Sequence, residues 1–174
     1  MRQRLIHLPG KIRGHISSGP PCSPFKYACW SFISGTIGIL AVSLVAVACG
    51  QLLLIGSFGA SAMLLFGVNN SPLAQPRNLI GGHLVSAGVA VIMAALFGPG
   101  LIVSAVTVGL AIMLMNLTHT EHPPGGATAL IGIQGNAGPL FILIPVLSGA
   151  LILLLVALFT NNVVYHRRYP LKWL

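Results

Sequence analysis

The residues best suited to chemistry lie together in one stretch, residues 120–129. Glu121 is the only acidic side chain among the 174 residues, and His122 follows it directly. Pro123 and Pro124 come next, and the Gly-Gly-Ala-Thr-Ala run after them could open a helix. Long apolar segments flank this stretch on both sides. A carboxylate and a histidine at a break in an otherwise apolar chain indicate a place where an ion or a proton is handled.

Two roles are open for Glu121. Its carboxylate could form a proton relay or a gate with His122 and His119, because histidine titrates close to neutral pH. Alternatively, Glu121 lies at the membrane surface and caps the following helix, where the helix dipole favours a negative charge. Pro123 and Pro124 are structural in either case, since they force an extended or turned backbone at His122.

The composition predicts an integral membrane protein. Charged residues make up 6% of the chain and hydrophobic residues 55%, whereas about a quarter of a soluble domain is charged. Almost no charge lies between residues 27 and 165, so lipid must be the solvent there. The net charge of +8 is concentrated at the two ends. Basic ends predict that both termini are cytoplasmic, which requires an even number of crossings. Because no basic helix or aromatic platform accompanies the charges, we expect no nucleic-acid partner.

The apolar segments predict an all-α polytopic protein with a basic cytoplasmic arm at 1–26, a transmembrane domain at 27–160 and a basic tail at 161–174. Four segments are long enough for a bilayer of about 30 Å: Tyr27–Cys49, Leu79–Phe97, Leu101–Leu117 and Pro139–Phe159. Two further segments are short or interrupted by glycine: Leu52–Val68 and Ala127–Ile133.

The two short segments correspond to each other. Shifting the sequence by 67 positions places Gly59-Ala60-Ser61-Ala62 on Gly126-Ala127-Thr128-Ala129. The same shift aligns an Asn and a Pro-Leu pair: Asn69 with Asn136, and Pro72-Leu73 with Pro139-Leu140. We therefore predict an internal duplication, with repeat one at about 27–97 and repeat two at about 98–160. Each repeat reads as a helix, a short small-residue segment and a second helix.

Short segments at equivalent places in two halves are typical of a transporter site. If each short segment crosses the membrane, the two halves are inverted; if each is re-entrant, the halves run parallel. Arg77 favours crossing, because crossing puts it on the cytoplasmic side.

The small-residue motifs are candidate anion sites. A helix that begins at each motif would point free N–H groups and its positive dipole end into a cavity, and Ser61 and Thr128 would add hydroxyl donors. Alternatively, the small residues only let helices pack closely. The candidate anion-binding residues are Gly59, Ala60, Ser61, Gly126, Ala127, Thr128 and Arg77.

Other chemistries have weaker support. His83, His119, Glu121 and His122 offer ligands for zinc or iron, but no metal-site spacing, and His83 alone is typical of a structural histidine that faces neighbouring helices. A hydrolase triad lacks its usual partners, because the chain has no Asp. We expect no catalytic residue, metal or cofactor. The three cysteines, Cys22, Cys29 and Cys49, are read as free thiols.

Several of these motifs together resemble the HPP family of integral membrane proteins. They are His122-Pro123-Pro124 followed by Gly125-Gly126-Ala127, the segment 56–62, and Ser71-Pro72-Leu73-Ala74-Gln75-Pro76-Arg77-Asn78. The likeness covers about residues 25–162. It implies a small protein with four transmembrane helices that is a transporter, and plastid and cyanobacterial relatives are associated with nitrite. The lack of a transit peptide or soluble domain suggests a bacterial inner-membrane member.

We therefore predict a transporter or channel for a small inorganic anion, with nitrite as the leading substrate and the lipid bilayer as its surroundings. A non-transporting membrane scaffold is the alternative, and a membrane metal site or enzyme is a third. So small a protein encloses little cavity alone, so we expect a homo-oligomer.

Overall fold

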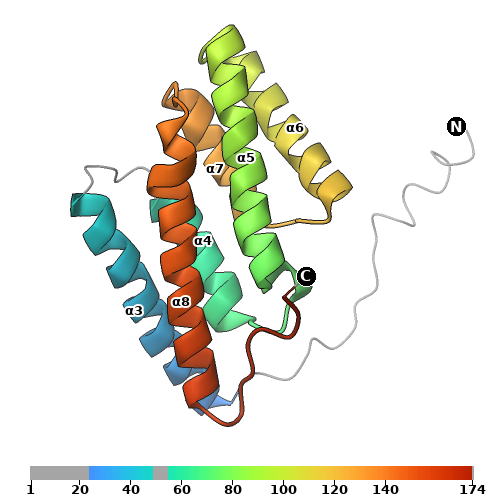
Figure 1. Cartoon of the computed structure of the whole chain (residues 1–174). Helices are drawn as coiled ribbons and strands as arrows, with labels where there is room; N and C mark the ends of the chain where they lie inside the picture. The colour runs from blue at the N-terminus through green and yellow to red at the C-terminus, as the bar shows by residue number, and fades with distance from the viewer. Residues whose placement is uncertain (1–23, 49–54, 174) are drawn as a thin grey trace, which may run out of the picture.

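The computed structural model describes residues 24–48 and 55–173, and these residues form helices and connecting loops without a strand. The long helices are α3 (Phe25–Ala48), α5 (Pro76–Phe97), α6 (Leu101–Thr118) and α8 (Ser148–Val163) (Figure 1). The short ones are α4 (Ile55–Ala62), the π-helix η2 (Met63–Gly67), the 3-10 helix η3 (Pro72–Ala74), α7 (Pro123–Gln134) and the π-helix η4 (Ile142–Leu147). The predicted all-α class is confirmed. Cys22, Cys49 and residues 1–23 of the predicted arm lie outside the described residues.

In the described part of the chain, four helical segments are long and apolar enough to cross a membrane, as the sequence predicts. They are Phe25–Ala48, Pro76–Phe97, Leu101–Thr118 and Ile142–Val163. Large apolar side chains cover their outer faces; Leu101, for example, is 91% exposed. In water such a surface would be costly, whereas lipid tails solvate it. The last segment is kinked at Ile144, whose backbone is non-helical ahead of Pro145, because proline cannot donate a helical hydrogen bond.

The two halves of the chain run in opposite directions. In the view of Figure 1, α3 and α5 run upward with α4 running downward between them, while α6 and α8 run downward with α7 running upward. The start of α3 and the end of α8 therefore lie at the same end of the molecule. This direction pattern is that of the inverted alternative, in which each short segment reverses the course of the chain.

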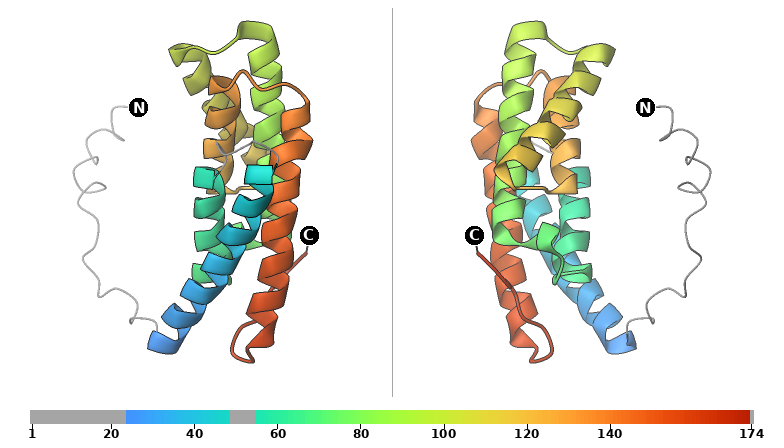
Figure 2. Two further views of the ribbon diagram at one scale, coloured as in Figure 1. Left: turned by 90° about the vertical axis from the view of Figure 1, so that its left-hand side faces the viewer. Right: turned by 90° about the vertical axis from the view of Figure 1, so that its right-hand side faces the viewer.

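Helices from the two halves of the chain pack against each other. The first helix of each half packs on the last helix of the other, α3 on α8 and α6 on α5, and the short helices α4 and α7 meet between them (Figure 2). If each helix is replaced by its equivalent in the other half, the α3–α8 pair becomes the α6–α5 pair. A duplication would account for this symmetry, and the duplication itself stays a prediction.

Glycines allow α7 to approach α5 closely. A Cβ added at Gly125 would lie 2.9 Å from the carbonyl oxygen of Gly82 and 2.7 Å from Ser86 Oγ. In contrast, a Cβ added at Gly59 or Gly126, in the two small-residue motifs, would meet nothing within 4 Å. Close helix packing inside the protein therefore depends on glycines other than the two in these motifs.

The two motifs lie inside helices, so the prediction that helices begin at 59–62 and 126–129 is wrong. The chain is already helical from Ile55 in α4, and α7 begins at Pro123. Proline suits a first helical turn, because its missing N–H has no intrahelical partner there. Neither Pro123 nor Pro124 has an N–H group, and the N–H of Gly125 donates to the carbonyl of His122 at 2.8 Å. The first turn of α7 therefore has no free amide to offer an anion from these three positions.

Candidate functional site

Five polar side chains are completely buried where α4, α5 and α7 meet. Each has an exposed fraction of 0%, and we call them the buried polar cluster: Ser57, Ser61, His83, His122 and Thr128. Ser57 and Ser61 lie four residues apart on α4 and so share one face of that helix. His83 comes from the first half of α5, and Thr128 from α7. Pro123 and Pro124 start α7 directly after His122, which is extended (φ −139°, ψ 99°) and lies at the helix N-cap.

The members of the cluster form one continuous series of hydrogen bonds. In order, the distances are Ser57 Oγ to Thr128 Oγ1, 2.8 Å; Thr128 Oγ1 to His83 Nδ1, 2.8 Å; His83 Nε2 to Ser61 Oγ, 2.9 Å; Ser61 Oγ to His122 Nε2, 2.9 Å; and His122 Nδ1 to the carbonyl oxygen of Leu73, 2.9 Å. All are ordinary hydrogen-bond lengths. The rings of His83 and His122 also meet edge to face, with centroids 4.9 Å apart.

The backbone at one end fixes the direction of the series. The carbonyl oxygen of Leu73 can only accept, so Nδ1 of His122 carries a proton. In a neutral ring Nε2 of His122 is then an acceptor, and Ser61 donates its only proton to it. Ser61 must therefore accept from Nε2 of His83, which leaves Nδ1 of His83 without a proton.

The same logic continues to the other end of the cluster. Thr128 donates to the bare Nδ1 of His83, and Ser57 donates its one proton to Thr128. The alternative bond from Ser57 Oγ to the carbonyl oxygen of Pro124, at 2.7 Å, is therefore not made in this arrangement. With both histidines neutral, every hydrogen bond in the series points from Ser57 toward Leu73. The two histidines must be opposite tautomers, with the proton on Nε2 in His83 and on Nδ1 in His122.

The cluster has a second self-consistent arrangement that holds one more proton. If His122 is protonated on both nitrogens, its Nε2 donates to Ser61, and each following member must turn to donate toward Ser57. At that end the carbonyl oxygen of Pro124 lies 2.7 Å from Ser57 Oγ and can accept its proton. One added proton thus reverses the four bonds between Ser57 and His122. Such a series can respond to protonation as a unit.

Comparison with known proteins places the whole membrane region in one family. A family model described as HPP, transmembrane region, matches residues 20–170. The chain belongs to the HPP family. Two transmembrane proteins of Dictyostelium discoideum are each 47% identical to it. One matches over 166 residues, 88% of this chain and 58% of the relative, and the other over 156 residues, 83% of this chain and 50% of the relative. The chain thus spans about half the length of these curated relatives. No solved structure matches.

Three of the candidate site residues predicted from the sequence come together in the cluster, namely Ser61, Thr128 and His122. Their neighbours in the two motifs do not join them. Gly59 and Ala60 are exposed, and Gly126 and Ala127 are half-buried. The hydroxyl position and the last alanine of each motif (Ala62 and Ala129) are therefore buried, whereas the glycine and the first alanine lie on other faces.

Glu121 and His119 do not join His122. Among the described residues the Glu121 carboxylate has no hydrogen bond or salt bridge, and its backbone carbonyl accepts from Asn78 Nδ2 at 2.8 Å. Nor does Glu121 cap α7, because His122 holds the N-cap position without a side-chain cap bond. His119 is exposed and ends α6 in the left-handed conformation (φ 54°), so it is not part of the buried polar cluster. Within the described residues no group of three His, Cys, Asp or Glu could hold a metal.

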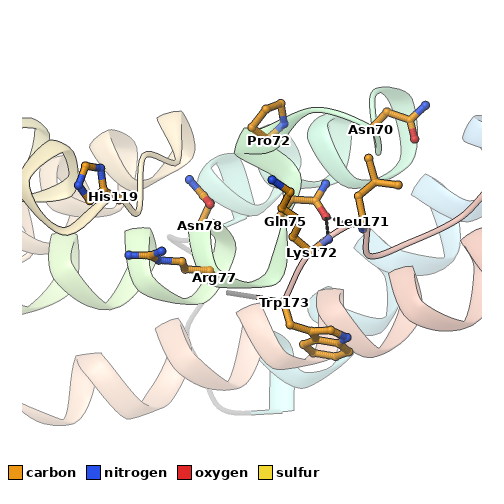
Figure 3. A pocket seen from close by; sticks show the side chains of 9 residues that line it. All are labelled: Asn70, Pro72, Gln75, Arg77, Asn78, His119, Leu171, Lys172 and Trp173. Carbon is orange, nitrogen blue, oxygen red and sulfur yellow. Dashed lines mark hydrogen bonds between the residues drawn. The ribbon is translucent and has the colours of Figure 1, made fainter.

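Arg77 lies at a surface pocket of about 320 Å³ (Figure 3). Its guanidinium donates to the carbonyl of Thr118 at 2.9 Å and so ties the start of α5 to the end of α6. The tail forms part of the pocket wall, where the backbone N–H of Leu171 donates to Gln75 Oε1 at 2.8 Å. The remaining lining residues are Asn70, Pro72, Asn78, His119, Lys172 and Trp173.

Sequence reasoning missed Ser57 and the part played by His83. His83 was expected to face neighbouring helices, and it does so, but its hydrogen bonds join both halves of the protein. Ser57 carried one usable signal, since it precedes Ser61 by four residues and so lies on the same helical face.

Proposed function

We propose that this HPP-family membrane protein transports a small anion, with nitrite as the leading substrate, and couples its movement to protons. The observation that carries the proposal is the buried polar cluster, whose two hydrogen-bond arrangements differ by one proton. The cluster joins α4 and α7, the short helices of two halves that run in opposite directions. Secondary transporters commonly place their sites where such broken segments of inverted halves meet.

The energetics favour a functional reason for the cluster. Polar groups inside a membrane protein are costly unless they are hydrogen-bonded, and ionisable ones are typical of proton pathways. Apolar residues of similar size would pack α4, α5 and α7 together without any such requirement. Retaining two histidines there is explained if their protonation changes during transport. A positive charge on the cluster would also attract an anion into the low-dielectric interior.

Nitrite is proposed because it is a small monovalent anion and because HPP relatives are associated with it. We expect no enzymatic activity and no cofactor. A homo-oligomer, a bacterial inner membrane and cytoplasmic termini stay predictions.

The test is nitrite uptake into liposomes reconstituted with purified protein, with and without an inwardly directed proton gradient. We expect saturable uptake that the gradient accelerates. Thr128→Val should reduce gradient-driven uptake by about tenfold or more, the effect of ~1.4 kcal/mol on a rate, because it removes the donor to His83. Thr107→Val is the matched control, since Thr107 is also fully buried but donates only within its own helix, to Val103.

Glu121→Gln separates this proposal from a relay through Glu121. Because the Glu121 carboxylate has no bond to the cluster in the described residues, the variant should retain gradient-driven uptake. Loss of coupling in Glu121→Gln with normal coupling in Thr128→Val would contradict the proposal. Flux no greater than that of empty liposomes, from folded protein, would remove nitrite transport and favour a non-transporting scaffold.

A further inference from the structure

A second polar site lies at the end of the molecule where α3 begins and α8 ends. A pocket of about 940 Å³ opens there between the first turns of α3, the end of η2 and the residues that follow α8. Its wall includes Tyr27 and Ser31 of α3, the link residue Ser71, and His166 and Arg167. None of these residues belongs to the buried polar cluster.

Arg167 is tied into the protein by neutral partners only. Its Nη1 donates to the carbonyl of Phe66 at 2.8 Å and to Asn161 Oδ1 at 3.2 Å. Its Nη2 donates to the carbonyl of Tyr27 at 3.0 Å and to Ser31 Oγ at 2.8 Å. The guanidinium is therefore held rigidly across α3, η2 and α8, and none of these acceptors carries a negative charge.

No carboxylate side chain compensates the charge of Arg167. The sequence contains one acidic residue, Glu121, and it is neither a partner of Arg167 nor part of the pocket wall. Burial lowers the pKa of Arg167, which is the expected sign when a cation is desolvated, although nearby Tyr27 opposes the shift. Two ring or side-chain nitrogens are also buried without a hydrogen-bond partner among the described residues, namely Arg167 Nε and His166 Nε2. Buried polar atoms without a partner are uncommon and require an explanation.

We infer that this pocket binds an oxyanion, with Arg167 as the fixed positive charge and His166 beside it in the pocket wall. Arginine suits the role, because its guanidinium keeps its charge. Since Nη1 and Nη2 of Arg167 already donate within the protein, Nε–H is its remaining donor. The ligand is either a free anion such as nitrite or the phosphate of an anionic lipid headgroup, since both present charged oxygens. The inference does not depend on the proposed transport activity, and its test measures binding alone.

The experiment observes the Nε–H resonance of Arg167 by ¹⁵N NMR, with the full protein in maltoside micelles, which contain no phosphate. One arm adds sodium nitrite, and the other adds dihexanoyl phosphatidylglycerol. Sodium chloride at equal ionic strength is the control for screening. We expect a saturable shift of this resonance in at least one arm and no comparable shift with chloride. A shift in the nitrite arm assigns the site to a free anion, and a shift only in the lipid arm assigns it to a headgroup.

A matched pair of variants at Ser71 tests charge without disturbing Arg167. Ser71 caps η3 by accepting from the N–H of Leu73 at 3.2 Å, and both Asp and Asn can make the same cap. Ser71→Asp places a carboxylate in the pocket wall, so it should weaken binding at least about tenfold, whereas Ser71→Asn should leave binding close to that of the unmodified protein. Absence of a saturable shift with either oxyanion would overturn the inference, as would equal affinities of the two folded variants.

Discussion

At the scale of single residues, the state of the buried polar cluster is set by which atom of each hydrogen bond carries the proton. Leu73 offers only a carbonyl oxygen to His122, and when both histidine rings are neutral this constraint fixes the donor at every step back to Ser57. A serine or threonine hydroxyl between two histidines makes the tautomer of one ring dependent on that of the other. The sequence predicts Ser61, Thr128 and His122 as site residues, but it does not show which of them are in contact across helices.

The first prediction concerns the histidine tautomers. In the unmodified protein at a pH where both rings are neutral, His83 should carry its proton on Nε2 and His122 on Nδ1. Ring ¹⁵N chemical shifts distinguish a protonated nitrogen from a bare one and so check the assignment. Finding the same tautomer in both rings would contradict the hydrogen-bond directions derived above.

The second prediction compares two buried serines. Ser61→Ala removes the partner shared by His83 and His122, so it should reduce the free energy of unfolding by about 1–3 kcal/mol. Ser34→Ala should change it little, because Ser34 Oγ is buried without a partner among the described residues. Denaturant unfolding in micelles measures both. A similar loss in the two variants would show that the bonds of Ser61 add nothing to stability.

At the scale of elements, the short helix α7 is positioned by its close contact with α5. The sequence predicts the long helices to within a few residues: Leu79–Phe97 is observed as Pro76–Phe97, and Leu101–Leu117 as Leu101–Thr118. Apolar length alone determines such segments. The start of α7 was predicted at the Gly-Ala motif and is observed at Pro123, because proline at the first turn outweighs the small-residue pattern. The left-handed turn at His119, which ends α6, has no signal in the pattern of apolar residues.

The third prediction uses two neighbouring glycines of α7. Gly125→Ala should destabilise the protein by about 1–3 kcal/mol, because the new Cβ would lie 2.9 Å from the backbone oxygen of Gly82. Gly126→Ala should be neutral or stabilising by at most about 1 kcal/mol, since nothing lies within 4 Å of the added atom. Unfolding midpoints of the two proteins provide the comparison. Equal destabilisation would show that the α5–α7 contact is not this close.

At the scale of the whole molecule, two oppositely directed halves enclose the buried polar cluster. Charge at the two ends of the sequence predicts that they share one side of the membrane, and Figure 1 shows the start of α3 and the end of α8 at one end of the molecule. The relation between the halves needed the structure, because a short segment that crosses and one that re-enters have the same composition. The uncompensated charge of Arg167 also depends on the whole molecule, since the hydrogen-bond partners of its guanidinium come from α3, η2 and α8.

The fourth prediction tests this topology. In a cysteine-free background, Lys26→Cys and Tyr165→Cys should react with a membrane-impermeant maleimide from the same side of sealed vesicles, since both positions are exposed near the shared end. Pro99→Cys, in the link between α5 and α6, should react only from the opposite side. Labelling of positions 26 and 165 from different sides would rule out the inverted arrangement.

The central claim is that the buried polar cluster couples anion movement to a proton. The most direct measurement is the internal pH of protein-containing liposomes when a nitrite gradient is imposed without an initial pH difference. The interior should acidify as nitrite enters, beyond the acidification of empty liposomes, which reports passive permeation of nitrous acid. Ser61→Ala should bring the signal close to that of empty liposomes, and Ser34→Ala should leave it unchanged. Protein-dependent nitrite entry without a change in internal pH would contradict proton coupling.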